Sequence, residues 1–208
     1  MISLEYLKTH GKRSSKLARI KMLADMQYSI SVIDEMYSAG VNRKNSIVAD
    51  IQSRCEELAA RSDIPEEQFR DEVYYLYEND PSNEVLELLE EMQIVALYKL
   101  VETTMKRVLK ISEIPIPEKK KMTFLGLISH KNLHLNLAEV YGYASFNELR
   151  LINNCIKHSG KVSKQLSNYD CWAFDAKVTK CGAAYDRLKQ DVQRFVINWS
   201  DEIIKTIA

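Results

Sequence analysis

Hydrophobic positions recur every three or four residues along most of the chain. In the N-terminal part this spacing predicts a helix over about residues 15–38, which Gly40 would end, because glycine commonly follows a helix C-terminus. A second apolar stripe predicts a helix over about residues 44–60. The segment SDIPEE combines capping side chains, a proline and two acids, and so predicts the start of a third helix over about residues 66–77.

The longest predicted helix covers about residues 82–112. Its first half is acidic and its second half is basic, which is the distribution that a helix dipole favours. Two prolines followed by three lysines in SEIPIPEKKKM break the pattern and predict a loop.

The helical pattern returns in the last third of the chain. Ser145 and Glu148 form the S-x-x-E pattern of a capping box, which predicts a helix from about Phe146 that ends before Gly160. A looser polar stretch follows, and a final amphipathic helix is predicted over about residues 183–207.

These elements predict an all-α fold, a helical bundle of about seven helices. Glycine (6) and proline (4) are scarce among the 208 residues, which disfavours a turn-rich β architecture. Two organisations fit the pattern. Residues 1–80 are an N-terminal helical extension or subdomain beside a bundle over residues 81–208, or residues 1–208 form one continuous domain.

Composition and charge indicate which ligands and which cellular location to expect. Lysine plus arginine (29) equals aspartate plus glutamate (29), so no global field attracts nucleic acid and any polyanion must meet a local patch. The four cysteines form no C-x-x-C pair and the start of the chain lacks a secretory signal, so we expect reduced thiols and a cytoplasmic location. No apolar run is long enough to cross a membrane, and we expect no membrane association.

The predicted helix in NELRLINNCIKHSG has one apolar and one polar side. Cations near a helix C-terminus and a solvated polar face are common, and this is one interpretation. Adjacent asparagines are poor helix formers, however, and a purely solvated face would more often carry glutamate, lysine or glutamine. The other interpretation is a site built on the polar side, whose residues are Arg150, Asn153, Asn154, Lys157 and His158.

The polar side offers a specific chemistry. The guanidinium of Arg150 can bind a phosphate through two hydrogen bonds, and His158 can transfer protons near neutral pH. Asn154 can orient either group or bind a base or a ribose. This combination suits cleavage of RNA without a metal or cofactor, in which the 2′-hydroxyl attacks the adjacent phosphate.

The segment ELRLINNCIKHSGKVS resembles the signature helix of the HEPN superfamily, all-α domains that include many metal-independent ribonucleases, toxins and phage-defence proteins. The family motif is an arginine, four to six residues and a histidine, often with an asparagine after the arginine. Asn154 and His158 match its asparagine and histidine. Asn153 stands where the arginine is usual, and Arg150 lies one turn earlier. The resemblance covers roughly the last 120 residues and is specific over residues 148–163.

The resemblance implies an endoribonuclease of a defence or toxin–antitoxin system, with Arg150, Asn154 and His158 as catalytic residues. It also implies a homodimer with facing signature helices, RNA or a nucleotide as ligand, and an antitoxin or another protein as partner. The displaced arginine leaves a second interpretation open, a non-catalytic module of the same fold that binds a nucleotide, RNA or a protein.

Glu102 and Lys106 in VETTMKR resemble an E-x-x-x-K/R element that faces the catalytic helix in some HEPN families. A surface i, i+4 ion pair explains the same residues without a site. We expect Lys106, Lys157, Lys161 and Lys164 to hold phosphates if His158 cleaves RNA, with Glu102 and Asn153 in supporting positions, although lysines in loops are usually only solvated.

HKNLH places His130 and His134 at the spacing of two metal ligands on one helix face, but no third ligand is evident, so we interpret both as structural. Trp172 and Phe174 are interpreted as core anchors rather than base-stacking platforms.

Overall fold

The protein is described by a computed structural model over residues 4–78, 80, 82–116 and 122–207, with side chains from Ser14 onward. The predicted all-α class is confirmed, because the only β feature of these residues is an isolated bridge between Lys161 and Lys177. The α-helices are α1 (Leu4–Ala24), α2 (Gln27–Ala59), α3 (Glu66–Glu78), α4 (Ser82–Ser112), α5 (Phe124–Ile128), α6 (Tyr143–His158) and α7 (Cys181–Ile207).

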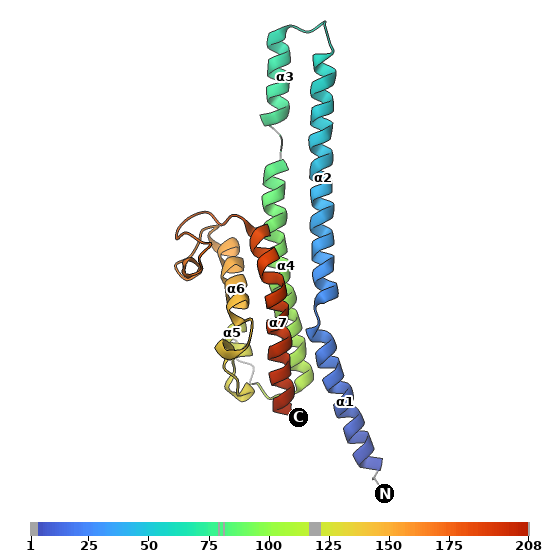
Figure 1. Ribbon diagram of the computed structural model, residues 1–208, viewed down its shortest axis with the longest axis vertical. Helices are drawn as coiled ribbons and strands as arrows, with labels where there is room; N and C mark the ends of the chain where they lie inside the picture. The colour runs from blue at the N-terminus through green and yellow to red at the C-terminus, as the bar shows by residue number, and fades with distance from the viewer. Residues whose placement is uncertain (1–3, 79, 81, 117–121, 208) are drawn as a thin grey trace.

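The centre of the bundle is α4, which packs against α1, α2, α6 and α7 (Figure 1). Leu97, Val101 and Val108 are fully buried on α4 and meet large side chains of α7 such as Trp199. The indole of Trp199 donates a hydrogen bond to the backbone oxygen of Ile128 at 3.2 Å, so α5 is fastened to α7.

The boundaries predicted from capping residues and periodicity are confirmed for α3, α4 and α7 within two residues.

The predicted boundary between the first two helices is wrong. The break lies at Asp25 and Met26, where Met26 is buried and the Asp25 carboxylate accepts a hydrogen bond from the Gln27 N–H at 3.1 Å. Gly40 lies inside α2 instead of ending a helix. A Cβ atom at Gly40 would lie 2.6 Å from Cδ1 of Leu89 on α4, so this glycine permits two helices to approach closely.

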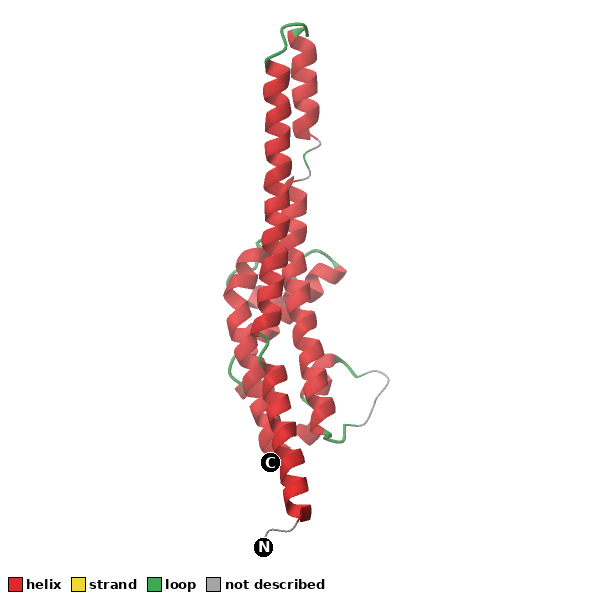
Figure 2. Ribbon diagram, turned by 90° about the vertical axis from the view of Figure 1, so that its right-hand side faces the viewer, coloured by secondary structure: helices red, strands yellow, loops and turns green. Residues whose placement is uncertain are grey.

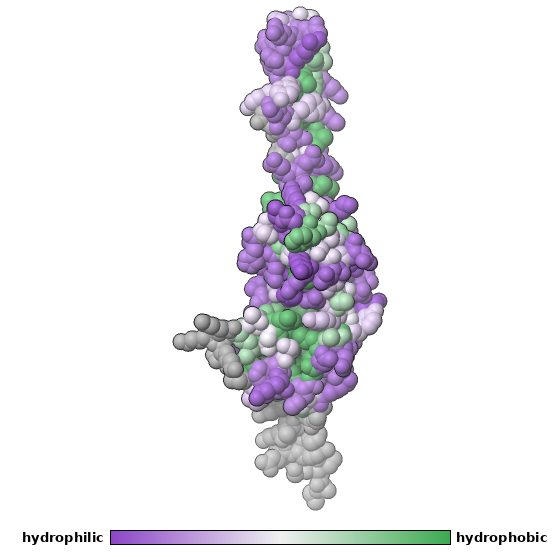
Figure 3. All heavy atoms as spheres, turned by 90° about the vertical axis from the view of Figure 1, so that its left-hand side faces the viewer, coloured by the Kyte–Doolittle hydropathy of each residue, from purple (hydrophilic) through white to green (hydrophobic). Residues whose placement is uncertain are grey.

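Residues 41–78 form a two-helix arm that extends beyond the bundle (Figures 1 and 2). The C-terminal half of α2 lies beside α3 there, and α3 contains no buried residue. Hydrophilic side chains cover most of the arm in Figure 3, although Tyr74, Tyr75 and Tyr77 are also exposed. By contrast, α1 and the first part of α2 contribute Ile20 and Ile30 to the same core as α4 and α7.

Candidate functional site on α6

The start of α6 is fixed by a glycine and not by the predicted capping box. Gly142 is the N-cap residue and has a left-handed φ of 86°. A Cβ atom there would lie 2.4 Å from the backbone oxygen of Asp191 on α7, so only glycine fits. Ser145 lies inside the helix, and the carboxylate of Glu148 is buried and bonded to other residues. The helix therefore begins three residues before the predicted Phe146.

The end of α6 agrees with the prediction. His158 is the last helical residue, and Gly160 follows in the left-handed region with φ of 65°. The N–H groups of Ser159 and Gly160 both donate hydrogen bonds to the backbone oxygen of Cys155, at 3.1 and 2.8 Å. This C-terminal closure leaves Lys157 and His158 exposed on the last turn.

The predicted polar side of α6 is only partly correct. Lys157 and His158 are exposed and Arg150 and Asn154 are half-buried, but Asn153 is only 1% exposed. The Oδ1 atom of Asn153 has no hydrogen-bond partner. The buried arc of α6 is wider than half the helix because α4 and α7 both pack on it. Asn153 therefore belongs to the core, and a side chain at this position does not reach solvent.

Arg150 is held toward the start of the helix. Its Nε and one terminal nitrogen donate hydrogen bonds to Oδ1 of Asn147 at 3.2 and 2.9 Å, and the Asn147 amide donates to the Tyr169 hydroxyl at 2.9 Å. His158 lies eight residues later, which is about 12 Å along a helix axis. Arg150 and His158 are therefore about two turns apart on α6, and Asn147 holds the Arg150 guanidinium toward the preceding turn.

Side chains of α4 lie beside this face of α6. The ammonium of Lys157 lies 5.8 Å from the centre of the Tyr98 ring. Burial and the charge of Glu102 raise the pKa of Tyr98, whereas the charge of Arg150 lowers it, so the phenol lies between the acid of α4 and the arginine of α6. Glu102 therefore lies near α6, and its charge acts on the Tyr98 phenol in the direction opposite to that of Arg150.

Glu102 is bound by two lysines of its own helix. It accepts hydrogen bonds from Lys106 at 2.5 Å and from Lys99 at 3.2 Å. Burial alone would raise the pKa of Glu102, but the two lysines outweigh it and hold the pKa below its ordinary value. The ammonium of Lys106 also lies 5.8 Å from the centre of the Phe124 ring, which places it between α4 and α5. Two lysines thus share a single carboxylate here.

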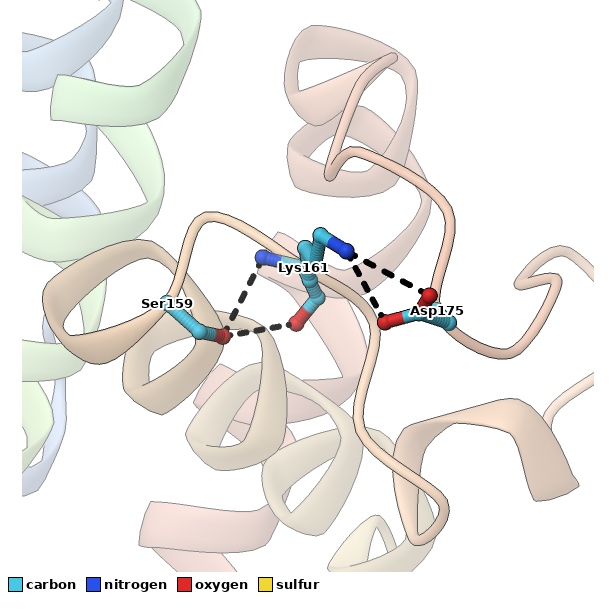
Figure 4. Close-up of polar contacts among 3 residues, drawn as sticks. All are labelled: Ser159, Lys161 and Asp175. Atoms are coloured by element: carbon cyan, nitrogen blue, oxygen red, sulfur yellow. Dashed lines mark hydrogen bonds and ion pairs between the residues drawn. The ribbon is translucent and has the colours of Figure 1, made fainter.

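Lys161 and Lys164, the other two predicted phosphate ligands, have different surroundings in the loop after α6. The Lys161 ammonium forms an ion pair with Asp175 at 3.2 Å, and the Ser159 hydroxyl bonds the Lys161 backbone (Figure 4). Lys164 is exposed, and only its backbone oxygen takes part in a hydrogen bond, accepted from Ser167. Lys161 is therefore already neutralised by a neighbour, whereas Lys164 is available to solvent.

A buried ion pair on the other side of α6 was missed by the sequence analysis. Glu148 is 3% exposed and accepts two hydrogen bonds from Arg187 of α7, at 2.6 and 2.9 Å. It also accepts one from the Trp172 indole at 2.8 Å. Trp172 is buried, as expected of a core anchor, while Phe174 is 66% exposed and is not one. The network joins α6, α7 and the loop between them, and so sets how α6 is rotated.

The two histidines of HKNLH do not share one helix face. They flank the three-residue 3-10 helix Lys131–Leu133, where Nδ1 of His130 accepts a hydrogen bond from the Asn132 N–H at 3.2 Å. His134 has a positive φ of 50° and ends that turn. Within the described ranges, no group of three or more histidine, cysteine or acidic side chains is arranged to hold a metal.

No known family model, curated protein or solved structure matches this chain. No helix in the described part of the chain combines the length and the apolar character needed to span a membrane.

Proposed function

We propose that this protein binds RNA through the face formed by α6 and the adjacent part of α4. This α4–α6 face is defined by Lys99, Lys106, Arg150, Asn154 and Lys157. The observation that carries the proposal is that Lys157 and Arg150 of α6 approach Tyr98 of α4, while Lys99 and Lys106 share the single carboxylate of Glu102. Surplus positive charge on a shallow surface is the main source of affinity for a phosphate backbone.

Two features favour RNA among polyanions. Asn154 is half-buried beside Arg150 and has no side-chain hydrogen bond among the described residues, so its amide is free to bind a base edge or a 2′-hydroxyl. The resemblance of residues 148–163 to the HEPN signature supports the same ligand class. Because the position of the family arginine is buried here, Arg150 supplies the cation from the exposed side.

Binding is tested with fluorescently labelled single-stranded RNA, followed by anisotropy across a salt series. Arg150→Gln and Lys157→Gln each lower the affinity and reduce the salt slope by about 0.7, the value for one lost phosphate contact on a single strand. Glu102→Gln has the opposite effect, because it releases Lys99 and Lys106 from their shared carboxylate. Arg70→Gln, which removes an exposed ion-paired arginine on the arm, is the control for net charge. Equal affinities for all four variants would refute the proposal.

Cleavage of the bound RNA is a second candidate function, favoured by the exposure of His158. Its imidazole has no hydrogen-bond or ion-pair partner among the described side chains. In this reaction the 2′-hydroxyl attacks the adjacent phosphorus and its proton passes to water, while the 5′-oxygen leaves with a proton from His158. Because Arg150 lies about two turns from His158 and its guanidinium is bound to Asn147, a second copy of the chain is the proposed source of the arginine for the same phosphate.

The cleavage test uses tRNA, rRNA and mRNA with excess EDTA. Wild-type protein is expected to leave fragments that end in a 2′,3′-cyclic phosphate, and His158→Ala to leave RNA intact while binding it with unchanged affinity. Arg150→Ala mixed with His158→Ala restores activity if the two residues act across a dimer. An active His158→Ala protein would exclude this second function without affecting the binding proposal.

A further inference from the structure

The zero net charge of the chain conceals a strong separation of charge along its length. Residues 41–78, the arm, contain five basic and nine acidic residues, and the first half of α4, residues 82–98, contains four acids and no cation. At the other end, residues 4–24 of α1 contain six basic residues and one acid. α1 and the C-terminal half of α4 lie together at the end opposite the arm (Figure 1). One end of the molecule is therefore acidic and the other basic.

The basic end contains a cleft of about 980 Å³ between α1 and the end of α4. Its apolar floor includes Leu17, Leu23 and Ile111, which are only partly exposed. Its rim carries four cations and one acid, which are Lys16, Arg19, Arg107, Lys110 and Glu113.

Most of this rim charge is uncompensated. Lys16 pairs with Glu113 at 2.9 Å, and Glu113 is 81% exposed, so water screens the pair. Arg19, Arg107 and Lys110 have no ion-pair or side-chain hydrogen-bond partner among the described residues. Like charges on two packed helices repel one another, and a bound anion would remove that repulsion. By contrast, Lys177 in the loop before α7 is paired with Glu87.

The cleft and the α4–α6 face adjoin along α4. Arg107 and Lys110 line the cleft, and Lys106 of the α4–α6 face lies one helical turn before Lys110 on the same side of α4. The residues from 99 to 110 span roughly 16 Å of helix. A strand that crosses α4 obliquely would therefore meet cations along its whole path.

We propose that the α1–α4 cleft binds backbone phosphates of the same RNA strand that the α4–α6 face holds. This inference rests on the proposed RNA-binding function. The cations bind phosphate oxygens, and the described residues that line the cleft include no aromatic side chain on which a base could stack. The contacts in the cleft are accordingly independent of sequence, and the contribution of the cleft depends on the length of the RNA, because a short strand cannot reach both surfaces.

The test compares three double variants that each lose two positive charges. They are Arg107→Gln/Lys110→Gln in the cleft, Arg150→Gln/Lys157→Gln on the α4–α6 face, and Arg61→Gln/Arg70→Gln as a control on the arm, in which both arginines are exposed and ion-paired. Circular dichroism establishes that all three are folded. Affinity is measured by anisotropy with a long and a short single-stranded RNA, and with vesicles that contain anionic lipid.

The cleft variant is expected to bind the long RNA about tenfold more weakly, with a salt slope reduced by roughly 1.4, since two phosphate contacts are lost. On the short RNA it should differ from wild type by less than about twofold, because the α4–α6 face remains. The control should match wild type on both.

Wild-type affinity of the cleft variant for the long RNA would refute this inference, whatever the face variant does. Loss of binding in the cleft variant alone would retain the cleft and refute the α4–α6 face as the proposed site. Binding to anionic vesicles that depends on Arg107 and Lys110, without binding to RNA, would assign the cleft to a membrane surface and refute both proposals.

Discussion

Removal of Arg187 tests how firmly α6 is held against α7. The guanidinium binds both carboxylate oxygens of Glu148, whose side chain is only 4% exposed, whereas the Arg187 side chain is 46% exposed. Arg187→Ala therefore leaves a buried carboxylate with only the Trp172 indole as partner. Such a change costs 3–5 kcal/mol when both partners are buried, and the exposure of Arg187 places the expected loss near the lower end, at about 3 kcal/mol.

Urea unfolding followed by circular dichroism measures this loss, and the fluorescence of Trp172 and Trp199 together reports the same transition. In thermal unfolding the loss corresponds to a Tm lower by roughly 6–12 °C for a chain of this size. Arg194→Ala is the matched control, because its pair with Asp191 is exposed on both sides and contributes less than about 1 kcal/mol. Glu148→Gln combined with Arg187→Ala should lose less than the sum of the single changes. A loss below about 1 kcal/mol for Arg187→Ala, or strict additivity, would contradict the inferred role of the pair.

Four further outcomes are expected. Gly142→Ala should unfold at a urea concentration lower by an amount equivalent to about 2 kcal/mol or more, because the new Cβ meets the Asp191 backbone and φ is positive; an unchanged midpoint would contradict this. Asn153→Arg, which restores the arginine of the HEPN pattern, should lower the free energy of unfolding by about 3 kcal/mol and should not improve RNA binding, since the site is buried. Folding lowers the pKa of Glu102, so its ionised carboxylate stabilises the fold above the unfolded-state pKa of about 4.3. The difference in stability between wild type and Glu102→Gln, up to about 1 kcal/mol, should disappear as the pH falls through the lowered folded-state pKa. Burial, with nearby Glu91 and Glu90, raises the pKa of Cys181 to about 12, so a thiol reagent at pH 8 should label exposed Cys171 quickly and Cys181 only after unfolding, as peptide mapping would reveal.

Local signals predicted the helices whose ends depend on local chemistry. The segments before α3 and after α4 contain prolines and capping residues, and α7 has a regular apolar stripe, so their boundaries followed from the sequence. The break at Asp25 and Met26 has neither glycine nor proline; Met26 is buried there among residues distant in sequence. At Gly40 the sequence predicted a helix end where none exists. A single sequence does not distinguish a glycine that ends a helix from one that makes room for a side chain of a neighbouring helix, here Leu89.

The same limitation affected the site. A helical wheel divides α6 into two halves, which assigned Asn153 to the polar side and Glu148 to a capping box. Both residues are buried because α7 and the loop that carries Trp172 cover α6 from one side while α4 covers it from another. The exposure of Lys157 and His158 depends on neighbours within one turn and followed from the sequence. The pairing of Glu102 with Lys106, one of the two interpretations of these residues, also depends on local spacing. The cleft between α1 and α4 joins residues about 90 positions apart and had no local signal.

The arm has a thermodynamic consequence of its own. Its two helices lack a buried residue beyond the part of α2 that contacts the bundle, so the hydrophobic contribution to their stability is small. Amide protons of α3 and of the second half of α2 should therefore exchange through local opening events of low free energy, while those of α4 and α7 exchange only on complete unfolding. The native state of this protein then comprises two cooperative units that share one helix, and thermal melting proceeds along α2 from the tip of the arm toward Gly40.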